Sequence, residues 1–435
     1  MKQRRWLLWV LTGLTLGAAW VAWSRSPFGG AGAAIQREVD RARADGLPVT
    51  PPELRALLDA KPGTNAASDY LNAISATKTS PGSPRPLTDA QALADKAFNR
   101  TLTSKQASDL RRNLALLGPA FARAEAGAAC DHLNYGRAYE QGILLLLPDL
   151  APFRALAVDL AIDGVTRIDG GDVDTGIRRL ETAAHMARHL GEDPLVVSAV
   201  IHASIERQVL DASLRVLERH SREPSVVAGL SKVLKDLGTP TDLRPNVAGE
   251  FVLSHRTCEV LGGKETEFLT SMGITNVDEA RFRSLRLTWV RQANEATLLK
   301  FWRTYYEALP KDPDDVSGIE AAAEQAKKAI ADASGPARFL YDQISLFTDT
   351  NDHPFATAIA QRRVLKAGLT FAKGLVRPDP ASRESRDPFG NGPLKYASPG
   401  GNLRIYSVGL DGKDDGGDRK RDLGIELPYP SNLKR

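Results

Sequence analysis

The sequence predicts a mainly α-helical protein that starts with a membrane-spanning helix and ends in a small β-hairpin. Three observations lead to this prediction. An uncharged run lies near the N-terminus, apolar residues recur every three to four positions through the middle, and the tail is rich in Gly, Asp and Pro. Abundant Ala and Leu, with only 6% aromatic residues, also favour helix over sheet.

The uncharged run extends from Trp6 to Trp23. As a helix it would be about 27 Å long, close to the thickness of the hydrocarbon core of a bilayer. Three basic residues among the first five precede the run, whereas only Arg25 follows closely. The positive-inside rule therefore predicts a single-pass anchor over residues 1–26 in the inner membrane, with the N-terminus in the cytoplasm and the body outside it. A cleaved signal peptide, ending near Ala31-Gly32-Ala33, is the alternative.

Helical patterns follow a Gly-rich spacer. The pattern is sharpest after Phe153, where Asp169-Gly-Gly-Asp172 separates two helices and Gly191 ends the second, before Pro194 opens a third. Three helices joined by short polar turns are typical of antiparallel neighbours. They are similar in style to tetratricopeptide hairpins, but the diagnostic positions and a sustained period of about 34 residues are missing. A multi-helix bundle or an irregular TPR-like solenoid is therefore expected.

Breaks in this pattern suggest domain boundaries. Thr239–Pro245 contains two prolines, and Arg377–Arg386 is a charged linker that contains another. We expect a helical domain over 35–238, a second helical region over 246–376 and a tail over 387–427. Further helices are expected at 35–45, 65–76, 88–100, 104–117, 278–308, 317–333 and 355–376.

Charge and cysteine content limit the possible partners. Lys and Arg number 57 and Asp and Glu 53, a net charge of +4, which gives no reason to expect nucleic acid. Cys130 and Cys258 could form a disulfide in an oxidising compartment or remain buried free thiols. Two cysteines this far apart are not a disulfide framework.

The tail contains a series of short motifs, which are Asp387-Pro-Phe-Gly, Pro393-Leu-Lys-Tyr, Ser398-Pro-Gly, Tyr406-Ser-Val-Gly, Asp411-Gly and Asp422-Leu. Two short apolar runs joined by Ala-Ser-Pro-Gly-Gly predict a hairpin. With these motifs the tail resembles the C-terminal end of the major pseudopilin of type II secretion systems. It also looks like the tail of uncharacterised, membrane-anchored bacterial helical proteins. No prepilin cleavage motif precedes the anchor, so the resemblance implies the pseudopilin loop and not assembly into a filament.

The resemblance implies that the final loop binds calcium, with Asp411 and Asp422 as the best matches and Asp415 or Asp418 next. The composition of the loop is compatible with this role, because calcium takes six to eight oxygen ligands from carboxylates and carbonyls. The candidate ligands are therefore Asp411, Asp415, Asp418 and Asp422, with Asp414 as a fifth nearby carboxylate. The alternative is a solvated Asp/Gly loop in which Arg419, Lys420 and Arg421 supply the counter-charges.

Recognisable catalytic motifs are missing from the sequence. Glu181, His185 and His189 share one helix face, but Met186 stands where a zinc protease needs Glu. A helix face with a Glu–His contact is the simpler interpretation. Cys130-Asp-His132 places a thiol near an imidazole without any recognised surrounding motif.

We therefore expect a non-enzymatic envelope protein, tethered through residues 6–23, that presents a helical surface to an unidentified protein and has a structural calcium site. The rival is an envelope hydrolase whose site is spread over distant residues. A pocket in which His132, His185 or His189 meets carboxylates would favour the hydrolase. A third interpretation, based on the tail alone, is an accessory of a secretion or pilus-like machine.

Overall fold

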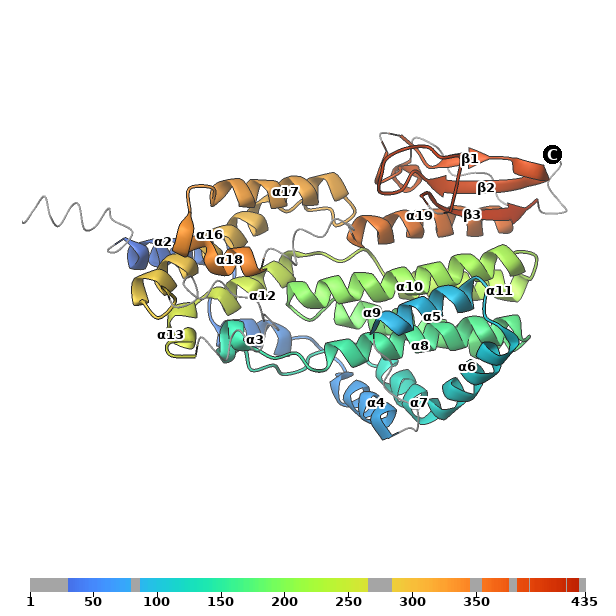
Figure 1. Cartoon of the computed structure of the whole chain (residues 1–435), viewed down its shortest axis with the longest axis horizontal. Helices are drawn as coiled ribbons and strands as arrows, with labels where there is room; N and C mark the ends of the chain where they lie inside the picture. The colour runs from blue at the N-terminus through green and yellow to red at the C-terminus, as the bar shows by residue number, and fades with distance from the viewer. Residues whose placement is uncertain are drawn as a thin grey trace, which may run out of the picture.

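The computed structural model describes residues 30–79, 87–264, 284–344, 354–374, 382–390, 392–419 and 421–429. These residues form a mainly helical protein with a small three-stranded antiparallel sheet near the C-terminus (Figure 1). The predicted anchor over residues 6–23 lies outside the described residues. Within the described ranges, no helix combines the length and the apolar character needed to cross a bilayer.

Three long helices run through the centre of the molecule: α8 (Leu150–Asp169), α9 (Val173–Leu190) and α10 (Val196–His220). They confirm the three helices predicted after Phe153. Two glycines let α8 and α9 pack closely, because a Cβ on Gly164 would lie 2.9 Å from the Gly176 carbonyl oxygen. The predicted cap is also present, since the Asp172 carboxylate accepts the Thr175 N–H at 3.4 Å.

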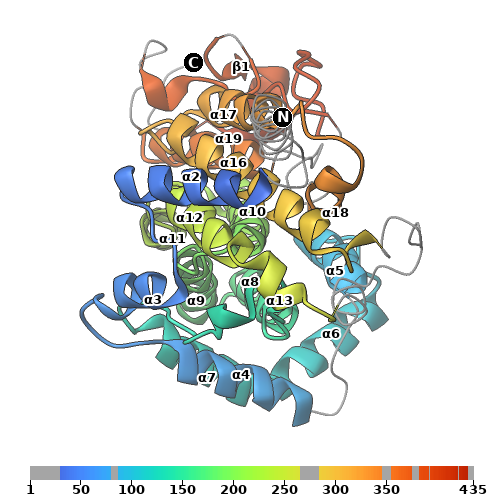
Figure 2. The same ribbon diagram turned by 90° about the vertical axis from the view of Figure 1, so that its left-hand side faces the viewer.

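Helices α4 and α7 form the lowest layer below these three, whereas α2 lies above them (Figure 2). Thr50 caps α3 through a capping box with Glu53, and two prolines open that helix. The helices before α8 are α2 (Ala31–Ala44), α3 (Pro51–Asp59), α4 (Ala67–Thr79), α5 (Leu87–Phe98), α6 (Ser104–Leu116), α7 (Gly118–Ala128) and the 3-10 helix η1 (Tyr139–Leu144).

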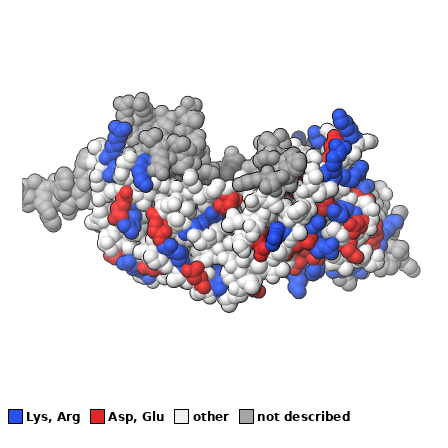
Figure 3. Space-filling model, turned by 90° about the horizontal axis from the view of Figure 1, so that it is seen from below, with Lys and Arg blue, Asp and Glu red and all other residues white. Residues whose placement is uncertain are grey.

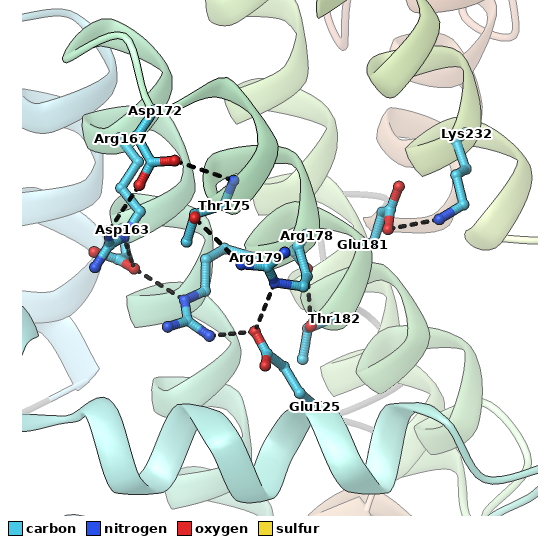
Figure 4. A network of polar contacts seen from close by, with 10 residues as sticks. All are labelled: Glu125, Asp163, Arg167, Asp172, Thr175, Arg178, Arg179, Glu181, Thr182 and Lys232. Atoms are coloured by element: carbon cyan, nitrogen blue, oxygen red, sulfur yellow. Dashed lines mark hydrogen bonds and ion pairs between the residues drawn. The ribbon is translucent and has the colours of Figure 1, made fainter.

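A polar network joins α7, α8 and α9 (Figure 4). The carboxylate of buried Asp163 accepts hydrogen bonds from Arg167 at 2.7 Å and from Arg179 at 3.0 Å. Arg179 also pairs with Glu125 of α7. Two guanidinium groups thus satisfy a carboxylate that burial alone would penalise.

Further helices follow α10 and lie on several sides of the central layer (Figure 1). They are α11 (Pro224–Asp236), α12 (Arg244–Ser254), α13 (Thr257–Leu261), α16 (Thr288–Ala308), α17 (Val316–Ala329), η2 (Gly335–Arg338), α18 (Phe339–Ile344) and α19 (Pro354–Ala372). Arg303 of α16 pairs with Glu38 of α2 at 2.6 Å. The division near residues 238–246 stays a prediction, and the two largest buried clusters each take residues from both sides of it. Cys130 and Cys258 are free, half-buried thiols.

Helix α19 lies between α10 and the sheet (Figure 1). Its Arg362 pairs with buried Glu206 of α10 and donates to the carbonyls of Leu237 at 3.2 Å and Gly238 at 2.6 Å. Burial alone would raise the pKa of Glu206, but Arg362 and His202 outweigh burial and lower it to about 2.

The sheet has the order β1-β2-β3, with β1 (Lys395–Ala397), β2 (Asn402–Ser407) and β3 (Leu423–Pro428). The expected hairpin corresponds to β1 and β2, which are joined by η5 (Pro399–Gly401). The third strand was not expected. It pairs with β2, so that Ile425 lies opposite Ile405, and it packs against α10 and α19.

Two carboxylates fasten the tail. Asp387, just after η4 (Arg383–Ser385), is buried and accepts the Ser407 hydroxyl at 2.6 Å and the Val408 N–H at 2.8 Å. Glu218 of α10 accepts the backbone N–H of Glu426 at 2.9 Å, and also binds Arg419 at 2.5 Å. The Asp-Pro-Phe-Gly motif therefore has a structural use within the tail.

The backbone of α12 approaches the Pro194 carbonyl so closely at Gly249 that a side chain there should destabilise the fold. A Cβ on Gly249 would lie 1.6 Å from the Pro194 carbonyl oxygen, so Gly249→Ala should lower the free energy of unfolding by at least about 2 kcal/mol. Gly32→Ala is the control, because a Cβ there meets nothing within 4 Å, and it should stabilise α2 by up to about 1 kcal/mol. Urea unfolding followed by circular dichroism measures both, and an unchanged midpoint for Gly249→Ala would contradict this packing.

Candidate metal centre

The predicted ligands lie in the loop between β2 and β3. Gly416 and Gly417 have φ angles of 70° and 81°, which side chains rarely adopt, and they turn the loop back on itself. Its two ends touch, because a Cβ on Gly409 would lie 2.1 Å from the Arg421 carbonyl oxygen. The loop is therefore closed by backbone contact.

Two of the four predicted ligands are exposed. Asp411 accepts the Lys413 N–H at 3.0 Å, a local turn contact. Asp418 contributes its backbone carbonyl, which accepts the N–H groups of Arg421 at 2.9 Å and Asp422 at 2.7 Å. Its side chain is exposed. Both residues therefore shape the loop, and neither side chain is buried within it.

The other two, Asp415 and Asp422, present buried oxygens. Asp422 is 2% exposed and its Oδ2 accepts the Gly417 N–H at 2.7 Å, but its Oδ1 has no partner among the described residues. Asp415 Oδ1 binds Arg421 at 3.1 Å, whereas its buried Oδ2 likewise has no partner in the described part of the chain. Burying an acceptor without a hydrogen bond carries a free-energy cost.

The charges around Asp422 repel its ionised form. Burial raises the pKa of Asp422, and the carboxylates of Asp415 and Asp414 raise it further, whereas backbone contacts from Gly417 and Asp418 oppose the shift. Asp414 is itself engaged, because it accepts the Tyr406 hydroxyl at 2.8 Å, and this bond lowers the pKa of Asp414. A cation beside Asp415 and Asp422 would relieve the repulsion.

The described side chains alone do not complete a metal site. Among the described residues, no three His, Cys, Asp or Glu side chains are close enough to hold a metal ion. Two carboxylates cannot supply the six to eight oxygens that calcium takes, so backbone carbonyls and water would have to provide the remainder.

The histidine face of α9 does not form a zinc pair. The side chains have separate partners: Glu181 binds Lys232 at 2.8 Å, and His185 Nε2 lies 3.5 Å from the Asp236 carboxylate. His189 Nδ1 lies 2.9 Å from the hydroxyl of Tyr70. The expected Glu–His contact is therefore replaced by contacts to α11 and α4.

The structure brings the two histidine motifs of the sequence together inside the core. His189 is fully buried, and burial, Arg188 and His185 lower its pKa to about 3, with a smaller contribution from His132. Tyr70, its hydrogen-bond partner, carried no signal in the sequence, because an isolated tyrosine in a helix is most often a core residue. His189 is therefore an uncharged core residue at neutral pH.

A fourth histidine, His202, has both a hydroxyl and a carboxylate beside its ring. Its Nε2 lies 2.6 Å from the Thr241 hydroxyl and 3.1 Å from the Glu206 carboxylate, while Nδ1 lies 2.5 Å from the Ala187 carbonyl oxygen. In hydrolytic triads the carboxylate holds Nδ1 and the hydroxyl faces Nε2. Here both groups share Nε2, so the carboxylate does not orient the ring for proton transfer from the hydroxyl.

The pKa of His189 predicts how stability depends on pH. An unfolded imidazole has a pKa of about 6.5, so below that pH the unfolded state binds a proton that the folded state binds only near pH 3. The free energy of unfolding should therefore fall as pH drops, by roughly 2 kcal/mol between pH 7 and 5 for this group. Urea titrations of wild type and His189→Gln test this, because the variant should lack that loss. Equal losses in both proteins would show that His189 is not the cause.

Comparison with known proteins leaves the function open. No family model matches the chain, and neither curated proteins nor solved structures give a significant match. The resemblance of the tail to the pseudopilin end stays a prediction from its motifs. The function is therefore inferred from the geometry of the described residues.

Proposed function

We propose that this protein is a membrane-tethered interaction module of the cell envelope, and that a calcium ion binds within its C-terminal loop. Ion binding is supported by two buried carboxylate oxygens, Oδ1 of Asp422 and Oδ2 of Asp415. Neither oxygen has a hydrogen-bond partner among the described residues. Ionised carboxylates in such a position are costly unless a cation or a donor meets them.

Calcium fits this position better than a transition metal does. The available donors are all oxygens, which suit calcium and magnesium, and calcium accepts the irregular geometry of a glycine-rich loop. Outside the cytoplasm even sites with dissociation constants of about 0.1–1 mM are filled. The ion would join Asp415 and Asp422 across the β2–β3 loop, and its role is structural.

The tether is proposed from the uncharged run over residues 6–23. Helix α2 lies at one end of the long axis and the sheet at the other (Figure 1). In the proposed arrangement the sheet points away from the membrane, and the helical body between them is available to a partner.

A protein partner suits the surface better than a nucleic acid does. Figure 3 shows the lower face, on which Lys and Arg side chains lie among Asp and Glu side chains with uncharged areas between them. Because positive and negative side chains are mixed on this face, it has no extended positive potential that would attract a polyanion. The non-enzymatic role is supported by His185, His189 and His202, because one ring nitrogen of each meets a structural partner.

Calcium should stabilise the tail of the intact protein. Adding CaCl2 to a few millimolar should slow hydrogen exchange of residues 409–428 and raise the melting temperature, because the ion binds only the folded loop. Asp415→Asn and Asp422→Asn should lose both effects. Asp411→Ala should keep them, because its side chain is exposed, although the family resemblance ranks Asp411 first. A calcium response that survives Asp422→Asn, or no response in wild type, would refute the site.

The proposed topology has a separate test. A reporter enzyme that is active only outside the cytoplasm, fused after Arg435, should be active in cells that express the full chain. Deleting residues 6–23 should abolish that activity, because the proposed export segment would be gone. A cytosol-specific reporter at the same position should stay silent, and the reverse pattern would contradict the tether.

A further inference from the structure

A cavity of about 580 Å³ opens beside the C-terminal end of α9, between α3 and the turn that precedes α12. This volume is within the usual range of ligand sites, about 300–1,000 Å³. Leu54, Leu57 and Leu58 of α3 give it apolar lining, and Pro240 and Pro245 line it from the turn before α12. Leu57 is 60% exposed, so the apolar lining continues onto the outer surface.

The charged groups around the cavity leave one cation without a counter-charge. Lys61 binds Glu192 at 3.0 Å, and Arg244 binds Asp242 at 3.2 Å. Arg188, the third basic residue of the lining, has no hydrogen-bond or ion-pair partner within the described ranges. Its Cδ lies 3.5 Å from where a Cβ on Gly238 would stand, so its stem rests against the backbone of the rim.

The chemistry of the lining indicates what the cavity would accept. A guanidinium group matches a carboxylate with two parallel hydrogen bonds. A single unpaired cation balances one negative charge, whereas a phosphate dianion would leave excess negative charge. The two ion pairs at the rim offer donors and acceptors to amide groups, which an alkyl chain lacks.

We propose that this cavity binds the free C-terminal carboxylate of a partner polypeptide. Arg188 pairs with the carboxylate, and the apolar side chains of the last residues pack against Leu54, Leu57 and Leu58. Capture of a terminal carboxylate is a recurring mode of peptide recognition. The inference rests on the proposed function, because it gives the interaction module a specific partner chemistry.

The test uses the full-length chain in detergent and isothermal titration calorimetry. The probes are acetyl-Gly-Ser-Ala-Val-Leu with a free carboxylate, the same peptide ending in an amide, and octanoate. The free acid should bind, and the amide should bind at least about tenfold more weakly because it carries no charge for Arg188. Octanoate should bind more weakly than the acid peptide. Tighter binding of octanoate, or equal binding of acid and amide, would overturn the proposal.

Two variants and a matched control locate the site. Arg188→Gln should weaken binding of the acid peptide at least about tenfold, and Leu57→Ser should weaken it several-fold. Arg188 has no hydrogen-bond or ion-pair partner within the described ranges, and Leu57 is exposed. Both variants should therefore keep the fold, which circular dichroism verifies. Arg111→Gln, an exposed arginine of α6 outside the cavity lining, should bind like wild type. Undiminished binding by Arg188→Gln would refute the assignment.

Crosslinking in intact cells separates this inference from the proposed function. Loss of a crosslinked envelope protein in Arg188→Gln, but not in Arg111→Gln, supports the cavity as the docking site. If Arg188→Gln keeps the same partner, the cavity proposal fails and the interaction module stands. If wild type crosslinks to no protein, the proposed function fails with it.

Discussion

The buried ion pair between Arg362 and Glu206 determines where α19 lies, and α19 carries the sheet. Both charges are removed from water, so the pair is tolerated only because the guanidinium group also satisfies two backbone carbonyls. The opposite face of α19 supports β2 and β3. Helix α10 contributes Glu206 to this pair and Glu218 to the edge of β3. Both contacts that hold the tail against the helical body therefore come from one helix, at its middle and near its C-terminal end.

Much of the helical fold followed from the sequence, because its signals are local. Thr50, Asp172 and the prolines mark helix starts by chemistry that acts within one turn. Strand β3 was missed for the opposite reason. Its apolar alternation is short and includes Gly424, a weak strand former, so its strand conformation depends on pairing with β2 and on packing against α10 and α19.

For the candidate cation site, the sequence predicted which residue types are present but not how they are arranged. The sequence supplies several aspartates within one loop, but nothing local distinguishes buried Asp422 from exposed Asp411. That difference arises when the backbone at Gly417 donates to one carboxylate and the loop closes over it. Arg188 was missed for a related reason, because a lone arginine in a helix looks the same whether or not the folded chain offers it a counter-charge.

The contact from Glu218 to the N–H of Glu426 has a consequence for the behaviour of many copies of the chain. A strand at the border of a sheet offers free amides to which another molecule can add a strand, and this is a common route to aggregation. Here a helix carboxylate occupies one of those amides and holds Arg419 beside it. This contact leaves one amide fewer on the β3 edge for the strand of a second molecule.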